Sequence, residues 1–117
     1  MTLILQQTKA EPELVNAIKN YTKVHNEILQ EVYAKAIKEF IDSFKNIAPG
    51  EHHPIFYASP SAGLTINLKL PEKLKNEAVQ LATKEQSSAR RLYYTALLRF
   101  ALNKKLINSK EDIMHGN

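Results

Sequence analysis

The stretch Gly63-Leu64-Thr65-Ile66-Asn67-Leu68-Lys69-Leu70-Pro71 decides the fold. Apolar and polar residues alternate along it, which is typical of a β-strand with one buried face. We expect Ile66, Leu68 and Leu70 on the buried face and Thr65, Asn67 and Lys69 on the outward face. Pro71 ends the strand, because it has no N–H group for a strand ladder and suits the first turn of a helix.

Two amphipathic helices are predicted after Pro71. Apolar residues recur at steps of three and four through the first helix, which places Leu74, Ala78, Leu81 and Ala82 on its inner face. Ser87 and Ser88 interrupt this pattern and offer a side-chain cap for a second helix. The inner face of that second helix is expected to carry Leu92, Tyr93, Ala96, Leu97 and Phe100.

A lone strand would leave its backbone N–H and C=O groups unpaired, and one strand with two helices buries little apolar surface. The simplest solution is a homodimer in which two copies of the strand pair antiparallel about a two-fold axis. The fold class predicted is therefore mainly α, with one short strand per chain and an intermolecular ribbon. The dimer core is expected to hold Ile66, Leu68, Leu70, Leu74, Leu81, Leu92, Ala96, Leu97 and Phe100.

Residues 63–107 resemble the ribbon-helix-helix family, which includes the Arc, MetJ and CopG repressors. The order apolar, Asn, Leu, basic, apolar, Pro over residues 66–71 resembles the Arc strand. The resemblance implies that Thr65, Asn67 and Lys69 contact DNA bases. A two-stranded ribbon is of a size to enter the DNA major groove. The alternative without a DNA-binding role is a solvated strand face, which ordinary antiparallel strands also have.

The resemblance also implies that the N-terminus of the second helix grips a DNA phosphate. The chain departs from the family pattern at Gln86, where Gly is frequent, at Ala78, where a larger apolar residue is common, and at Tyr94, where a basic residue is common. Basic residues at a helix N-terminus oppose the helix dipole, so phosphate binding explains them better than local stability does. The residues expected to contact phosphate are Ser87, Ser88, Arg90 and Arg91.

Charge is unevenly spread along the chain. The formal net charge is +4, but residues 1–50 sum to zero and residues 63–107 sum to +6. The positive charge therefore lies on the segment with the strand, and a dimer would carry twice as much. Such a surface attracts a polyanion such as double-stranded DNA.

The first half of the chain reads as helical. Residues 13–47 contain no Pro or Gly, and their apolar residues fall at helical steps. Either one helix over 12–47 or a hairpin broken near His25-Asn26 fits, whereas residues 2–7 are too short to assign. We expect residues 1–49 to form a helical extension that enlarges the dimer, builds a higher homo-oligomer or docks a protein partner. Residues 50–62 are expected to form a linker anchored by Ile55, Phe56 and Tyr57, and residues 108–117 a tail.

Several classes of protein are not predicted. The chain has no Cys, so disulfides and thiolate chemistry are excluded, and the apolar run Leu3-Ile4-Leu5 is too short for a signal or a membrane span. No nucleophile elbow, phosphate loop or suggestive pair of carboxylates occurs, so we expect no enzyme and no cofactor. His52-His53 lack further ligands nearby, so no metal site is expected. Tyr93-Tyr94 are expected to supply one core and one surface side chain.

The function predicted is sequence-specific binding of double-stranded DNA by a dimer, as a transcriptional repressor or autoregulator in the cytoplasm, on nucleoid or plasmid DNA. One alternative is an accessory protein of plasmid partition or of a conjugative relaxosome, with the N-terminal helices docking a motor or relaxase. Another is an antitoxin or protein-interaction module. In many antitoxins of the family that this segment resembles, the toxin-binding segment follows the DNA-binding module, whereas the additional segment here precedes it.

Overall fold

The structure, a computed structural model, describes residues 2–47 and 55–107. Within these residues the same order of strand, helix and helix occurs twice. The elements are β1 (Leu3–Ala10), α1 (Pro12–Val24), α2 (Leu29–Lys45), β2 (Leu64–Pro71), α3 (Glu72–Lys84) and α4 (Ala89–Asn103). The expectations for His52-His53 and for the tail at 108–117 lie outside the described residues.

The two strands pair with each other inside one chain. β1 and β2 are antiparallel, from Leu3 opposite Pro71 to Ala10 opposite Leu64. The strand and the two helices expected after Gly63 are confirmed, but the expectation of one strand per chain is wrong. β1 supplies the backbone partners that β2 needs, so pairing between two copies is not required to complete the ribbon.

The sequence hid β1 because its inward side is partly polar. The Gln6 amide carbonyl accepts a hydrogen bond from the Tyr93 hydroxyl at 3.0 Å, and the Thr8 hydroxyl donates to the Arg90 carbonyl at 2.8 Å. Burial raises the pKa of Tyr93 to about 12, so the phenol stays protonated and able to donate. Leu3 and Leu5, in contrast, are exposed on the outward side. Apolar and polar residues therefore occur on both sides of β1, since Ile4 and Ala10 lie on the inward side with Gln6 and Thr8.

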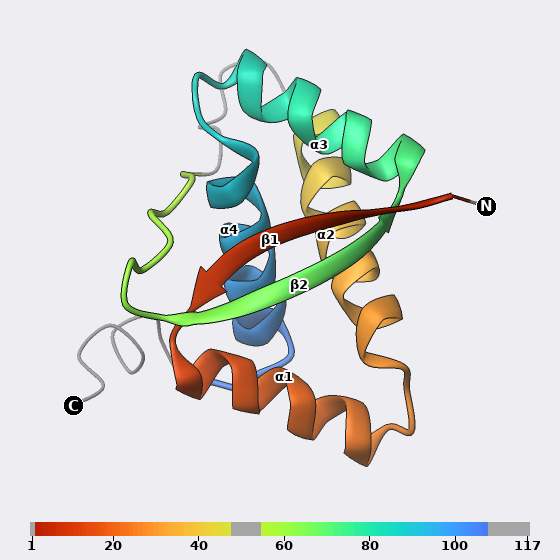
Figure 1. Ribbon diagram of the computed structural model, residues 1–117, viewed down its shortest axis with the longest axis vertical. Coiled ribbons are helices and arrows are strands. Elements are labelled where there is room, and N and C mark those ends of the chain that lie inside the picture. Colours follow the sequence, from red (N-terminus) through yellow and green to blue (C-terminus); the bar gives the residue numbers. More distant parts are fainter. Residues whose placement is uncertain (1, 48–54, 108–117) are drawn as a thin grey trace.

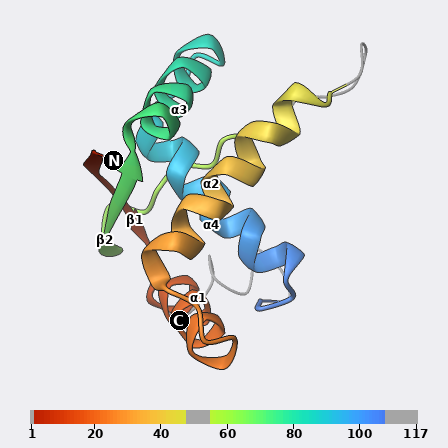
Figure 2. The ribbon, with the colours of Figure 1, turned by 90° about the vertical axis from the view of Figure 1, so that its right-hand side faces the viewer.

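The ribbon forms one layer and the helices form the rest of the molecule. Figure 1 looks onto the ribbon, with α2 and α4 behind it, α3 above it and α1 below it. Figure 2 shows that the C-terminal ends of α2 and α4 lie on the side away from the strands. One face of the sheet therefore covers helices and the opposite face points outward.

Residues 12–47 form two helices, with the break near His25-Asn26 that the sequence allowed. Asn26 adopts a left-handed backbone conformation, with φ of 53°. The Glu27 N–H donates to the Thr22 carbonyl at 2.9 Å and closes the end of α1. The turn between α3 and α4 is built in the same way, with Gln86 at φ of 57°.

The two units are related by a shift of 60 positions. This shift takes the first residue of α1, Pro12, to the first residue of α3, Glu72, and it takes Asn26 to Gln86. The first residues of α2 and α4 obey the same shift. We call residues 60 positions apart equivalent. Gln7 and Asn67 are equivalent and also lie opposite each other in the ribbon, so an approximate two-fold axis passes between them.

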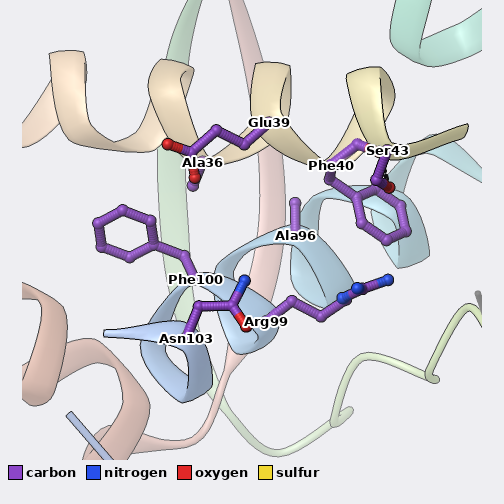
Figure 3. A pocket seen from close by; sticks show the side chains of 8 residues that line it. All are labelled: Ala36, Glu39, Phe40, Ser43, Ala96, Arg99, Phe100 and Asn103. Atoms are coloured by element: carbon purple, nitrogen blue, oxygen red, sulfur yellow. Dashed lines mark hydrogen bonds between the residues drawn. The ribbon is translucent and has the colours of Figure 1, made fainter. Parts of the chain in front are cut away.

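The same axis passes through the crossing of α2 and α4. Equivalent alanines, Ala36 and Ala96, are both buried there and let the two helices approach closely. Beside them is a hollow of about 50 Å³, far below the roughly 300 Å³ of a small-molecule site. Figure 3 shows its lining, which consists of four equivalent pairs: Ala36 and Ala96, Glu39 and Arg99, Phe40 and Phe100, Ser43 and Asn103.

A single core joins the two units. Residues of β1, α1 and α2 share one buried cluster with those of β2, α3 and α4. Of the residues expected in the core, Leu74 and Leu81 are partly buried, and seven are buried within one chain: Ile66, Leu68, Leu70, Leu92, Ala96, Leu97 and Phe100. Residues 2–47 therefore contribute half of the fold, with one strand and two helices.

The expectation that one of the two adjacent tyrosines lies at the surface is wrong. Tyr93 and Tyr94 are both buried. The Tyr94 hydroxyl donates to the carboxylate of Glu11, with 2.8 Å to Oε1, so its polar end has a partner inside the protein. Burial, followed by this carboxylate, raises the pKa of Tyr94.

The segment that enters β2 packs along α4. Phe56 and Tyr57 pack against the core as expected, whereas Ile55 is exposed. The Tyr57 N–H donates to the Thr95 hydroxyl at 2.8 Å. Gly63 passes so close to β1 that an added Cβ would lie 2.6 Å from the Ala10 carbonyl oxygen, which explains the need for glycine there.

We predict that Gln86→Gly stabilises the protein by roughly 0.5–1 kcal/mol, because glycine adopts the left-handed conformation without the steric cost that a side chain incurs. The matched control is Gln80→Gly, in the exposed interior of α3, which is expected to destabilise by about 1 kcal/mol. Urea unfolding measures both. Equal destabilisation by the two changes would contradict the backbone conformation at Gln86.

Candidate nucleic-acid interface

The outward face of the ribbon carries side chains from both strands. Beyond Leu3 and Pro71 at one end, three opposed pairs form this outward face: Leu5 opposite Lys69, Gln7 opposite Asn67, and Lys9 opposite Thr65. Lys9 is partly buried and the other five residues are exposed. Thr65, Asn67 and Lys69, the residues expected to read bases, thus lie together and face away from the core.

The centre of this face is a pair of amides. Gln7 Nε2 donates to Asn67 Oδ1 at 2.8 Å, across the approximate two-fold axis. Within residues 2–47 and 55–107, Asn67 Nδ2 donates to no protein acceptor and Lys69 Nζ has no bonded carboxylate. Donors therefore remain available to a ligand at the centre of the outward face.

The free edge of β2 is closed by one side chain of α2. Gln30 Nε2 donates to the Asn67 carbonyl at 2.9 Å, and Gln30 Oε1 accepts from the Lys69 N–H at 2.9 Å. A side-chain amide thus replaces the backbone of a further strand and reduces the tendency of this edge to pair with another chain. It also fixes the backbone of the two residues whose side chains point outward.

The free edge of β1 is closed by the segment before β2. The Ser59 hydroxyl donates to the Lys9 carbonyl at 3.1 Å and accepts from Arg90 Nε at 3.2 Å. Lys9 Nζ donates to the Ser61 carbonyl at 3.0 Å. The loop therefore holds Lys9 and Arg90 beside β1.

The N-terminus of α4 lies on this β1 side. Ser88 is the N-cap, as expected, and its hydroxyl accepts from the Arg91 N–H at 3.2 Å. Ser88, Arg90 and Arg91 are exposed. Ser87 differs from them, because its hydroxyl is buried without a hydrogen-bond partner among the described residues. Of the four residues expected to contact phosphate, three therefore have exposed side chains.

A hollow connects the outward face to the start of α4. Its volume is about 230 Å³, and its lining comes from both strands and α4: Gln7, Thr8, Lys9, Thr65 and Arg90. Two of these side chains are cationic and three carry neutral hydrogen-bonding groups. Such a lining suits an anionic group that lies beside the ribbon.

The N-terminus of α2 occupies the equivalent place on the β2 side, but its chemistry is opposite. Its N-cap is Ile28, with no side-chain cap hydrogen bond, and its first turn contains Glu31. Glu27, Ile28 and Glu31 are exposed. The ribbon therefore has a basic flank at α4 and an acidic flank at α2.

Sequence reasoning missed four residues of this surface, namely Leu5, Gln7, Lys9 and Gln30. The signal that could have found them is the shift of 60 positions, at which identical residues include Lys9 and Lys69, Tyr33 and Tyr93, Ala36 and Ala96, and Phe40 and Phe100. Most other positions differ at that shift, so the repeat is weak in the sequence alone.

Other kinds of site have little support in the described residues. No group of three or more His, Cys, Asp or Glu side chains that could hold a metal ion occurs in residues 2–47 and 55–107. No helix in those ranges combines the length and the hydropathy that crossing a membrane requires.

Comparison with protein-family models, with curated proteins and with solved structures gave no match for the chain.

We predict that Gln30→Ala destabilises the protein by about 1–2 kcal/mol, because each lost hydrogen bond costs roughly 0.5–1.5 kcal/mol. Amide hydrogen exchange at Lys69 should become faster, since its N–H loses its acceptor. The control Gln80→Ala removes an exposed amide from α3 and should leave this exchange unchanged. An unchanged exchange rate at Lys69 in Gln30→Ala would show that Gln30 does not close the edge of β2.

Proposed function

We propose that the protein binds double-stranded DNA sequence-specifically by inserting the outward face of the β1–β2 ribbon into the major groove. In this proposal the chain is a ribbon-helix-helix protein that carries both halves of the fold, and one chain replaces the expected homodimer as the DNA-binding unit. The observation that carries the proposal is the outward face itself, with six side chains from two strands on a backbone fixed at both edges.

The chemistry of this face suits the edges of base pairs. A two-stranded ribbon fits the width of the major groove. Gln7 and Asn67 have the donor and acceptor pair that matches adenine, and Lys69 matches the O6 and N7 acceptors of guanine. Leu5 is apolar and exposed, which suits contact with a thymine methyl group.

The charge distribution supports the same ligand. Residues 63–107 carry a net charge of +6, and the start of α4 presents Arg90 and Arg91 beside the ribbon. Cationic side chains that displace counterions from phosphates supply the sequence-independent part of DNA affinity. The N–H groups at a helix N-terminus add to the attraction for a phosphate.

Repression is the role we propose for this binding, through occupation of a site that overlaps a promoter. A selection of genomic fragments by the purified protein locates such a site. Recovery of DNA upstream of the protein's own gene supports autoregulation. Recovery of a transfer origin or a partition site supports the accessory role instead.

We predict that Lys69→Ala and Asn67→Ala each weaken binding to the selected DNA by on the order of 1–3 kcal/mol, because each removes a base contact. The matched control is Lys104→Ala, which removes the same charge from the C-cap of α4, on the side away from the ribbon. Fluorescence anisotropy with a labelled duplex measures the affinities, and salt titration separates the phosphate contribution.

If Lys104→Ala weakens binding as much as Lys69→Ala does, the effect is one of net charge and the proposed reading face is wrong. If the selection recovers no motif and binding is weak and salt-sensitive throughout, sequence-specific recognition is wrong as well.

A further inference from the structure

We infer that the protein reads a non-palindromic DNA site in one fixed orientation. This inference rests on the proposed DNA binding and deepens it. A homodimer presents the same side chains on both strands of its ribbon, so the two halves of its site repeat one sequence in inverted order. Here the two strands belong to one chain and differ in sequence at equivalent positions.

The outward face differs between its two halves at two of three positions. Lys9 and Lys69 are equivalent and chemically alike, but Gln7 is equivalent to Asn67 and Leu5 to Thr65. Leu5 offers only apolar contact, whereas Thr65 offers a hydroxyl as well as a methyl group. The base pairs that the two halves prefer must therefore differ at the position that Leu5 and Thr65 read.

The two lysines differ in their surroundings. Lys9 Nζ is held by the Ser61 carbonyl at 3.0 Å, whereas no bonded acceptor for Lys69 Nζ occurs in the described ranges 2–47 and 55–107. The loop that holds Lys9 lies on the β1 side of the ribbon. Within the described residues, the lysine that both halves contain is therefore restrained in the β1 half and not in the β2 half.

The flanks differ more strongly than the strands. Arg91 in the first turn of α4 is equivalent to Glu31 in the first turn of α2, and the N-cap Ser88 is equivalent to Ile28. Both helix starts flank the ribbon, where phosphates of the two DNA strands would pass. A phosphate is attracted by Arg91 and repelled by Glu31, so the DNA backbone is gripped on the α4 side alone.

Making the ribbon symmetric tests the base-reading part. Leu5→Thr/Gln7→Asn gives both strands the outward series Thr, Asn, Lys, and Thr65→Leu/Asn67→Gln gives both the series Leu, Gln, Lys. All four positions are exposed, so both variants should fold, which thermal unfolding checks. Each protein is then used to select duplexes from a random pool.

The wild type should select a motif without inverted symmetry. Each variant should select an inverted repeat of one half of that motif, and should bind it about tenfold more tightly than the wild type does, a difference of roughly one base contact. A palindromic wild-type motif, or symmetric variants that select the wild-type motif unchanged, would overturn the inference while leaving DNA binding intact. Failure of all three proteins to select any motif overturns the proposed function itself.

The equivalent pair Arg91 and Glu31 tests the one-sided grip. Arg91→Ala should reduce the slope of log affinity against log salt by about 0.9, the value for one lost phosphate contact. Glu31→Ala should tighten binding, and Glu31→Arg should steepen the slope by about 0.9. If Glu31→Ala instead weakens binding as much as Arg91→Ala, both flanks hold the DNA backbone and the one-sided grip is wrong.

Discussion

The pairing of β1 with β2 is the constraint on which the rest of the structure depends. Two strands alone are marginal in water, and each leaves one edge without a backbone partner. In this chain the helices cover one face of the sheet. The Gln30 side chain provides hydrogen-bond partners at the free edge of β2, and the Ser59 side chain does so at the free edge of β1. The register then fixes the two-fold axis between Gln7 and Asn67, and with it the crossing of α2 and α4 behind the ribbon.

Carrying both units in one chain relaxes a restriction that applies to a homodimer. In a homodimer any substitution appears twice, once in each half. In this protein Arg91 and its equivalent Glu31 have opposite charges, and polar Gln6 stands at the position equivalent to the buried Ile66. The shared core tolerates such differences because the polar groups have partners, as Gln6 has in Tyr93. The surface can therefore become asymmetric without loss of the common fold.

The second half of the fold could be predicted from the sequence, and much of the first half could not. β2 alternates cleanly, and Pro71 and Ser88 mark the helix starts. The inner face predicted for α4 is buried, although burial there runs continuously from Leu92 to Leu98 and is not limited to one helical face. β1 was not predicted, because residues 2–7 are too short to assign and apolar residues lie on both of its faces, with Leu3 and Leu5 outward and Ile4 inward. Without β1, the strand that follows Gly63 had no partner, and this led to the prediction of a dimer with one strand per chain. Tyr94 was misjudged for a similar reason, because its partner Glu11 comes from a distant part of the sequence.

We propose that one chain contains a complete DNA-reading ribbon. Native mass spectrometry of the protein with the shortest duplex that retains a selected motif tests this claim most directly. The account predicts a complex of one chain with one duplex, at all protein concentrations up to saturation. A smallest complex of two chains per duplex, with no single-chain species on the way to it, would contradict the account and restore the dimer as the DNA-binding unit.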